Sequence, residues 1–302
     1  MSTIAEPSTP PRPLNAVTTL SGGRAVRNTV ATVLMYAAFG VAMIPLVWIL
    51  WTVIADGWDL LLSSNWWTNS QRNILPDKIG GGVYHAIYGT LVQALVCAVI
   101  AVPLAVFTAV YLVEYGRGRF SQVVSFMVDI LTGIPSIVAA LFIYALWVTT
   151  FKFERVGFAV SLSLVLLMIP VVVRSTEEIL KLVPNELREA SYALGVPKWK
   201  TIARIVLPTA LGGIVTGVML GLARVMGETA PLLILGPYAA GINTDLFNGP
   251  MAALPTMIRE NFGQPDQPAV DRMWAAALTL IILVLLLNIA GRFVARFSGV
   301  KK

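Results

Sequence analysis

The chain has 302 residues, of which 57% are hydrophobic and only 13% are charged, and its mean hydropathy is +0.76. This balance excludes an ordinary soluble globular protein and is typical of membrane proteins. The single cysteine excludes a disulfide within the chain. The net charge of +6 comes from the connections described below, so it is no evidence for nucleic-acid binding.

The chain begins with a polar segment and continues in long apolar runs. Residues 1–28 are rich in Ser, Thr and Pro and lack the layout of a signal peptide, so we expect a disordered cytoplasmic tail. Residues 29–302 are expected to form an all-α transmembrane domain with about six helices, since a span needs about 20 apolar residues. The expected spans are 30–55, 83–113, 121–148, 156–173, 209–235 and 273–294.

Lys and Arg are concentrated in alternate connections between these spans. They are frequent in both terminal tails and in the connections after the second and fourth spans, and rarer elsewhere. Positively charged connections of membrane proteins lie in the cytoplasm. The sequence therefore predicts that both termini and the connection 175–208 are cytoplasmic.

The third expected span contains a carboxylate and a helix breaker. Asp129 precedes Pro135, which lacks an N–H and should leave the Leu131 carbonyl without its helical partner. Asp129 and Ser136 could form a secondary polar site, or Asp129 could have a structural role with a basic partner on another helix. Arg174, at the end of the fourth span, is expected to reach the cytoplasmic headgroups.

The connection 175–208 reads as two short helices around a glycine. Ser175 and Glu178 could cap the first helix, and Pro184 would end it or open another. Gly195 suits a left-handed helix end, and Pro197 suits the start of the next helix. That helix would have an apolar face formed by Trp199, Ile202 and Val206. Spacing alone allows either a docking elbow for a soluble partner or an amphipathic loop on the membrane surface.

The fifth expected span carries a glycine ridge. Gly213, Gly217 and Gly221 recur every four residues, a pattern that lets another helix approach closely. Arg224 and Glu228 lie in the same arc of about 80° as these glycines, so both charges should point toward a packed interface.

Arg224 and Glu228 have two possible roles. They could neutralise each other as a structural pair, although Arg before Glu is the less favourable order on a helix. Alternatively, Glu228 could orient the Arg224 guanidinium, whose planar fork suits a tetrahedral oxyanion in a transport path. Thr229 offers a hydroxyl beside them, and Pro231 should kink or break the helix there.

Three motifs resemble those of known protein families. The first motif resembles the EAA loop of ABC importer permeases. It consists of Glu189-Ala190-Ser191, Gly195 after three further residues, and Ile-Val-Leu-Pro at 205–208 after nine more. Ser191 stands in place of the usual third Ala. The segment 221–233, GLARVMGETAPLL, and the Gly-Ile-Pro-Ser at 133–136 resemble permeases of the phosphate-specific transport family, of its A type.

This resemblance implies a type I ABC importer permease fold in a bacterial-type plasma (inner) membrane and the import of inorganic phosphate. It assigns the substrate pathway to Arg224, Glu228 and Thr229. It assigns coupling to an ATPase homodimer to Glu189, Ala190, Gly195, Leu194 and Trp199. It further implies a C-type permease chain and an extracytoplasmic phosphate-binding protein as partners, with ATP and Mg on the ATPase.

The chain itself has no phosphate-cradling Gly-Lys-Ser/Thr loop, dinucleotide fingerprint or Cys/His cluster. We therefore expect no cofactor, no metal and no enzymatic activity on it. The alternatives are a permease for sulfate or molybdate, a non-transporting membrane scaffold or sensor, and an intramembrane hydrolase that would use Asp129 and Glu228 as a carboxyl pair.

Overall fold

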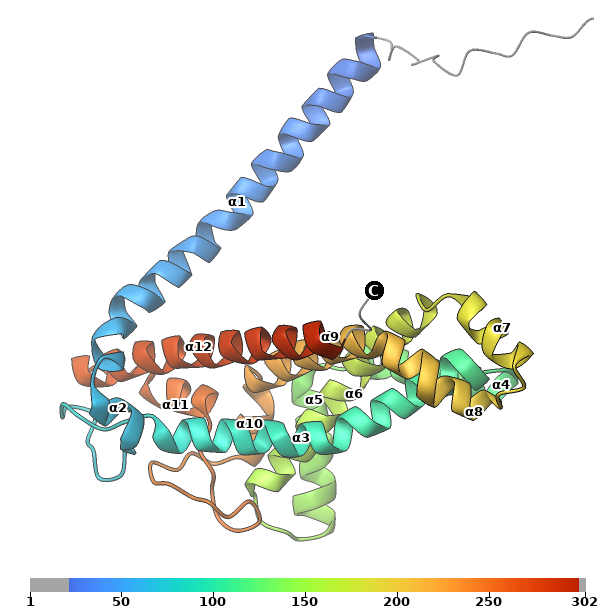
Figure 1. Cartoon of the computed structure of the whole chain (residues 1–302). Coiled ribbons are helices and arrows are strands. Elements are labelled where there is room, and N and C mark those ends of the chain that lie inside the picture. The colour runs from blue at the N-terminus through green and yellow to red at the C-terminus, as the bar shows by residue number, and fades with distance from the viewer. Residues whose placement is uncertain (1–21, 299–302) are drawn as a thin grey trace, which may run out of the picture. The chain divides into compact units, whose positions relative to one another are not determined.

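A computed structural model describes residues 22–298 of the chain, with side chains up to residue 295, and all regular structure in this range is helical (Figure 1). The α-helices are α1 (Gly22–Leu61), α2 (Ser64–Thr68), α3 (Tyr84–Val110), α4 (Gly118–Gly133), α5 (Ser136–Tyr144), α6 (Gly157–Lys181), α7 (Asn185–Ala193), α8 (Lys198–Thr201), α9 (Leu207–Met226), α10 (Ala230–Leu235), α11 (Leu254–Asn261) and α12 (Gln267–Ser298). Three π-helical segments extend or link them: η1 (Tyr111–Tyr115), η2 (Ala145–Thr150) and η3 (Ile202–Val206).

The expectation of about six spans is confirmed within the described residues. Five helices are long and apolar enough to cross a membrane, and the pair formed by α4 and the segment Ser136–Thr150 makes a sixth if it is counted as one span. This pair is bent by 104°, because Pro135 keeps the residue before it out of the helical region. The Leu131 carbonyl is not left free, since the Ile134 amide donates to it at 3.4 Å.

The chain divides into two compact units, residues 1–51 and 52–302. The described part of the first unit is α1 up to Trp51, which is apolar and exposed on all sides. The expected tail boundary at residue 28 falls inside α1, which already begins at Gly22. Residues 1–21 of the expected tail lie outside the described residues.

In the second unit, α6 is the central helix. Of its most apolar stretch 67% is buried, against 28% for α3 and for α12. It packs against α3, α4, α5 and α9. The neighbouring face of α3 is a seam of fully buried small residues at every fourth position: Cys97, Ala101, Ala105 and Ala109. Small side chains let backbones approach closely where lipid supplies no hydrophobic driving force.

The glycine ridge of α9 faces α6, which confirms that it serves close helix packing. A Cβ atom on Gly213 would lie 2.6 Å from the Ile179 side chain, and one on Gly217 would lie 2.6 Å from Ser175 Cβ. Any larger residue at these positions would force the two helices apart.

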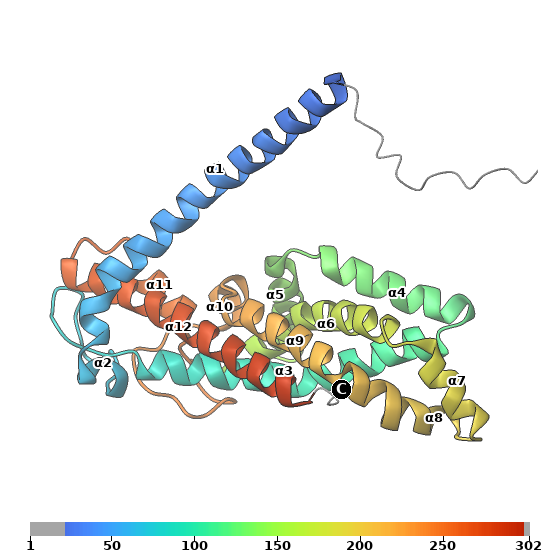
Figure 2. The same cartoon turned by 45° about the horizontal axis from the view of Figure 1, so that its top comes forward.

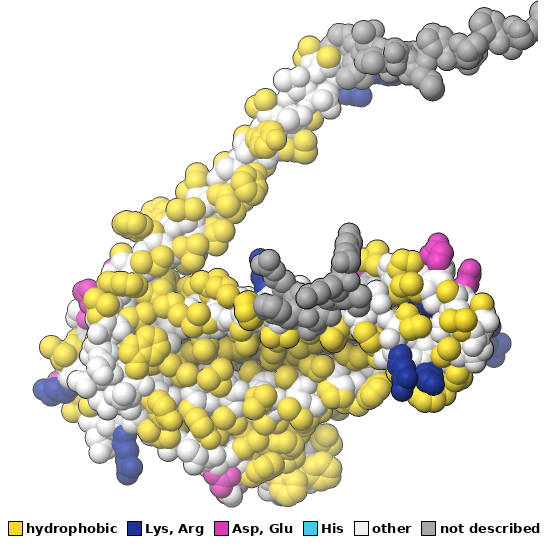
Figure 3. Space-filling view, in the orientation of Figure 1, with side chains coloured by type: hydrophobic (Ala, Val, Ile, Leu, Met, Phe, Trp, Pro, Cys, Tyr) yellow, Lys and Arg dark blue, Asp and Glu magenta, His cyan; other side chains and the backbone are white. Residues whose placement is uncertain are grey.

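The second unit has polar ends and an apolar middle. Helices α7 and α8 lie at one end, and α2 and α11 lie at the other (Figures 1 and 2). The side chains of Lys, Arg, Asp and Glu gather toward these ends, while the middle of the face in Figure 3 is mostly hydrophobic. This distribution is that of a bundle that crosses a hydrocarbon layer.

Candidate functional site

A charged pair lies where the fifth span breaks. Helix α9 ends at Met226, and residues 227–229 are not helical before α10 begins. Arg224 Nε lies 3.8 Å from Glu228 Oε1, which is too long for a hydrogen bond. The Arg224 side chain is 53% exposed and the Glu228 side chain 18%. The guanidinium is thus only loosely held by Glu228, and it faces the surface of this chain.

The break has the predicted cause. Pro231 lies in the first turn of α10 and cannot donate to the Gly227 carbonyl. The amides of Gly227 and Glu228 turn back instead to the carbonyls of Arg224 and Val225, at 3.2 and 3.3 Å. Glu228 therefore lies outside the helix, and the pair is not the intrahelical pair that a continuous span would form. Thr229 is exposed just before α10 and makes no capping hydrogen bond.

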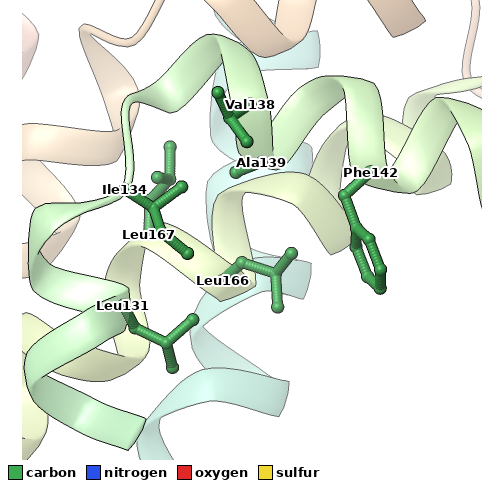
Figure 4. Close-up of a pocket in the computed structure, with 7 residues that line it drawn as sticks. All are labelled: Leu131, Ile134, Val138, Ala139, Phe142, Leu166 and Leu167. Carbon is green, nitrogen blue, oxygen red and sulfur yellow. The ribbon is translucent and has the colours of Figure 1, made fainter.

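The segments that follow the two breaks are neighbours. Helix α5, which begins at Ser136, packs against α10. In the angle between α4 and α5 lies a cavity of about 380 Å³. Its lining, drawn in Figure 4, is Leu131, Ile134, Val138, Ala139, Phe142, Leu166 and Leu167. These side chains are all hydrocarbon and offer an anion no donor, so the polar groups near the breaks come from the Arg224 region and Ser136.

Asp129 has a basic partner on another helix, one of the two roles that its sequence position allowed. The Asp129 carboxylate forms an ion pair with Arg174 of α6. Arg174 also bonds Glu177 Oε2 at 2.6 Å and Ser125 Oγ at 3.1 Å, and Lys181 bonds Glu177 Oε1 at 2.7 Å. Arg174 is thus held by two carboxylates of this chain, while its contact with the headgroups stays a prediction. The two carboxylates of the hydrolase alternative have different arginine partners, Asp129 with Arg174 and Glu228 with Arg224.

The connection 175–208 contains the predicted helix–glycine–helix elbow, but it begins later than predicted. Helix α6 continues through Ser175 to Lys181, because the fully buried Thr176 and Leu180 extend its packed face. The proposed cap of Ser175 and Glu178 was therefore wrong. We call residues 185–201, which comprise α7 and α8, the elbow.

Gly195 lies at the turn of the elbow in the left-handed region, with φ of +74°. Its amide donates to the Tyr192 carbonyl at 2.9 Å, and the Val196 amide donates to the Ser191 carbonyl at 3.2 Å. The buried hydroxyls of Ser191 and Thr201 are 2.8 Å apart and join α7 to α8. The third motif position thus uses its hydroxyl to close the elbow, which an alanine could not do.

The coupling residues assigned from the resemblance lie mostly on the surface of the elbow. Leu194 is 83% exposed and Trp199 is 65% exposed, and Glu189 and Ala190 are exposed as well. Trp199 does not share the buried face of Ile202 and Val206, as the spacing had suggested. From Lys198 to Met226 the chain is one helical stretch of 29 residues, so the elbow and Arg224 belong to the same rod.

Replacing Gly195 by Val is expected to open the elbow. No atom lies within 4 Å of an added Cβ, so the penalty is conformational only. A left-handed residue with a branched side chain costs about 2 kcal/mol, which raises amide exchange in residues 190–197 roughly 30-fold. Hydrogen–deuterium exchange of the purified permease measures this change. Gly195→Asn is the matched control, because Asn adopts this conformation readily; equal exchange in both variants would contradict the explanation.

Two buried arginines hold distant segments together, and neither contact was predicted from the sequence. Arg188, beside the motif, pairs with Glu114 at the end of the second span, at 2.8 Å. Arg272 is 3% exposed and donates to the carbonyls of Lys78 and Pro76 at 2.7 and 3.0 Å, which holds the outer loop after α2. Both pairings join residues far apart in the sequence, so no local spacing could have revealed them.

His85, near the start of α3, is buried and lies within hydrogen-bonding distance of another side chain. Its Nε2 lies 3.3 Å from the Tyr238 hydroxyl, which in turn donates to Gln71 Oε1 at 2.6 Å. Burial raises the pKa of Tyr238, so its hydroxyl stays protonated and keeps donating. This network ties the outer loops to the bundle.

Comparison with known proteins identifies the family. The profile of the family described as "Binding-protein-dependent transport system inner membrane component" matches residues 101–299. A Mycobacterium tuberculosis protein named "Phosphate transport system permease protein PstA 1" is 59% identical over 275 residues, covering 90% of each chain. The chain belongs to the PstA family of transport permeases. The Mycobacterium leprae protein named PstA is 55% identical, and the alignment covers 95% of this chain and 97% of that protein.

The fold agrees with this family. A chain in a crystal structure of a bacterial alginate ABC transporter superposes with a TM-score of 0.64, covering 91% of this chain and 97% of that one. At 15% identity this likeness concerns the fold alone, which is that of type I ABC importer permeases. The chain is accordingly a multi-pass inner membrane transport subunit and not an enzyme.

Proposed function

We propose that this chain is the permease subunit of an ATP-driven importer that carries inorganic phosphate into the cytoplasm. The observation that carries the proposal is the Arg224 and Glu228 pair at a helix break within a membrane span of a PstA-family chain. Ionisable groups inside membrane spans are costly and mark transport paths. Breaks at membrane depth are tolerated where they line a cavity.

In this proposal Arg224 attracts the anion. Its guanidinium presents a planar fork of donors that matches two oxygens of a phosphate group. Glu228, 3.8 Å away, orients the guanidinium and moderates its charge, so that the anion binds weakly enough to leave. Thr229 adds a hydroxyl. The exposure of Arg224 on a single chain supports a path completed by a second, C-type permease chain.

The partners follow from the same family assignment. The exposed apolar tip of the elbow supports docking of an ATPase homodimer, which would hold the ATP and Mg that this chain has no motif to bind. An extracytoplasmic phosphate-binding protein would deliver the anion to the outer loops. The alginate transporter was solved with its own periplasmic protein bound, which supports such an arrangement.

Uptake by the reconstituted importer tests this function. Radiolabelled phosphate is expected to enter proteoliposomes in an ATP-dependent manner, and unlabelled sulfate or molybdate in excess should not compete. Competition by sulfate or molybdate would favour the other oxyanions, because a guanidinium fork alone suits all of them. ATP-dependent uptake of none of these anions would point to a scaffold or sensor.

A further inference from the structure

Glu114 is a buried carboxylate that the proposed transport path does not use. It lies in η1, the π-helical end of the second span, and its side chain is only 5% exposed. One oxygen, Oε1, accepts from both Nε and Nη2 of Arg188, at 3.1 and 2.8 Å. A buried carboxylate needs such a partner, because an isolated charge in this environment is strongly unfavourable.

Arg188 joins three elements. It lies in α7, directly before the Glu189-Ala190 motif, and its side chain is 12% exposed. Besides Glu114, it donates to the carbonyls of Val183 at 2.6 Å and Leu180 at 3.1 Å, at the end of α6. The first helix of the elbow is thereby connected to the ends of both α3 and α6.

The second helix of the elbow is held at the same point. Lys198, the first residue of α8, donates to the Glu114 carbonyl and lies over the Tyr115 ring, with Nζ 4.7 Å from the ring centre. The Ser191–Thr201 hydrogen bond joins the two elbow helices to each other. Glu114 therefore contacts both helices of the elbow, α7 through Arg188 and α8 through Lys198.

We propose that Glu114 is a positioning residue that fastens the elbow to the second span, so that elbow, α3 and the end of α6 move as one body. The displacement imposed by the ATPase would then reach the α3–α6 pair as well as the rod that carries Arg224. This inference rests on the proposed function, since it assumes an elbow driven by an ATPase. In the alternative arrangement, α9 alone would transmit the movement of the elbow. The elbow would then have to move relative to α3.

A covalent lock distinguishes the two arrangements. In a permease with the single cysteine removed by Cys97→Ala, Tyr115→Cys and Lys198→Cys would be joined by a short bifunctional maleimide and assembled into proteoliposomes. The cross-linked importer is expected to keep most of the phosphate uptake of the same variant without cross-linker. Loss of uptake on cross-linking would overturn the proposal, because elbow and α3 would then have to separate in each cycle. If neither the parent protein nor the uncross-linked variant took up phosphate, the result would instead count against the proposed function.

A charge-neutral variant provides the second test. Glu114→Gln keeps the shape of the side chain but leaves Arg188 without its counter-charge. Phosphate transported per ATP hydrolysed is expected to fall at least about tenfold while ATP hydrolysis and complex assembly persist. Glu178→Gln, an exposed position near the end of α6, is the matched control. The proposal would be overturned if the ratio of phosphate transported to ATP hydrolysed did not change. This holds whether uptake is normal or falls together with hydrolysis, because Glu114 would then only support folding.

Discussion

Replacing Arg224 by Ala is expected to lower phosphate uptake about 100-fold, because two charge-assisted hydrogen bonds of about 1.5 kcal/mol each are lost. The side chain is exposed and only loosely paired with Glu228, so its removal leaves the packing of α9 on α6 intact. The assembled complex should therefore purify in normal yield. Initial rates of labelled phosphate uptake into proteoliposomes measure the effect.

Two further variants make this result specific. Arg224→Lys keeps the charge but loses the planar fork, so we expect its uptake to lie between those of the parent protein and the Ala variant. Arg292→Ala removes another exposed arginine, on α12, and should leave uptake unchanged. Normal uptake by Arg224→Ala would show that Arg224 does not contact the anion.

Leu194→Glu is expected to release the ATPase from the permease, with affinity falling at least about 100-fold. Leu194 is 83% exposed at the tip of the elbow, where a soluble partner would have to bury it. The substitution removes an apolar side chain worth roughly 1.5–3 kcal/mol and adds a charge that the interface would leave unpaired. Co-purification of ATPase with the tagged permease measures the loss.

The fold of the isolated permease should not change in this variant, since Leu194 packs against nothing that must rearrange. Leu194→Met has nearly the same volume and is expected to retain the ATPase. If Leu194→Glu bound the ATPase as tightly as the parent protein, the tip of the elbow would not be the docking surface.

Several parts of the site could be predicted from the sequence because they depend on local backbone chemistry. A proline cannot donate to the carbonyl four residues before it, and the two breaks lie at Pro135 and Pro231, as predicted. Gly195 adopts the left-handed turn that favours glycine. The ridge of Gly213 and its neighbours packs closely because small residues permit it.

Other parts could not be predicted because they depend on which helices become neighbours. The start of a helix at Ser175 was a sound local expectation, but packing of Thr176 and Leu180 carried α6 past it. Arg174 has the sequence position of a headgroup contact, yet α4 brings Asp129 to it. In the sequence, Arg188 is one of several cations in a basic connection. Its pairing with Glu114 arises only because the end of the second span packs beside it.

The sequence by itself determined the membrane class, the spans, the two helix breaks and the elbow, because hydropathy, proline and glycine act within a few residues of where they stand. The tertiary structure alone decided which charges meet. Ion pairs such as Arg188 with Glu114 join residues 74 positions apart, and their formation depends on helix packing that no local pattern encodes. The tertiary structure also exposes Arg224 and places it 3.8 Å from Glu228, so that the two are only loosely paired. This geometry makes the pair a candidate anion site.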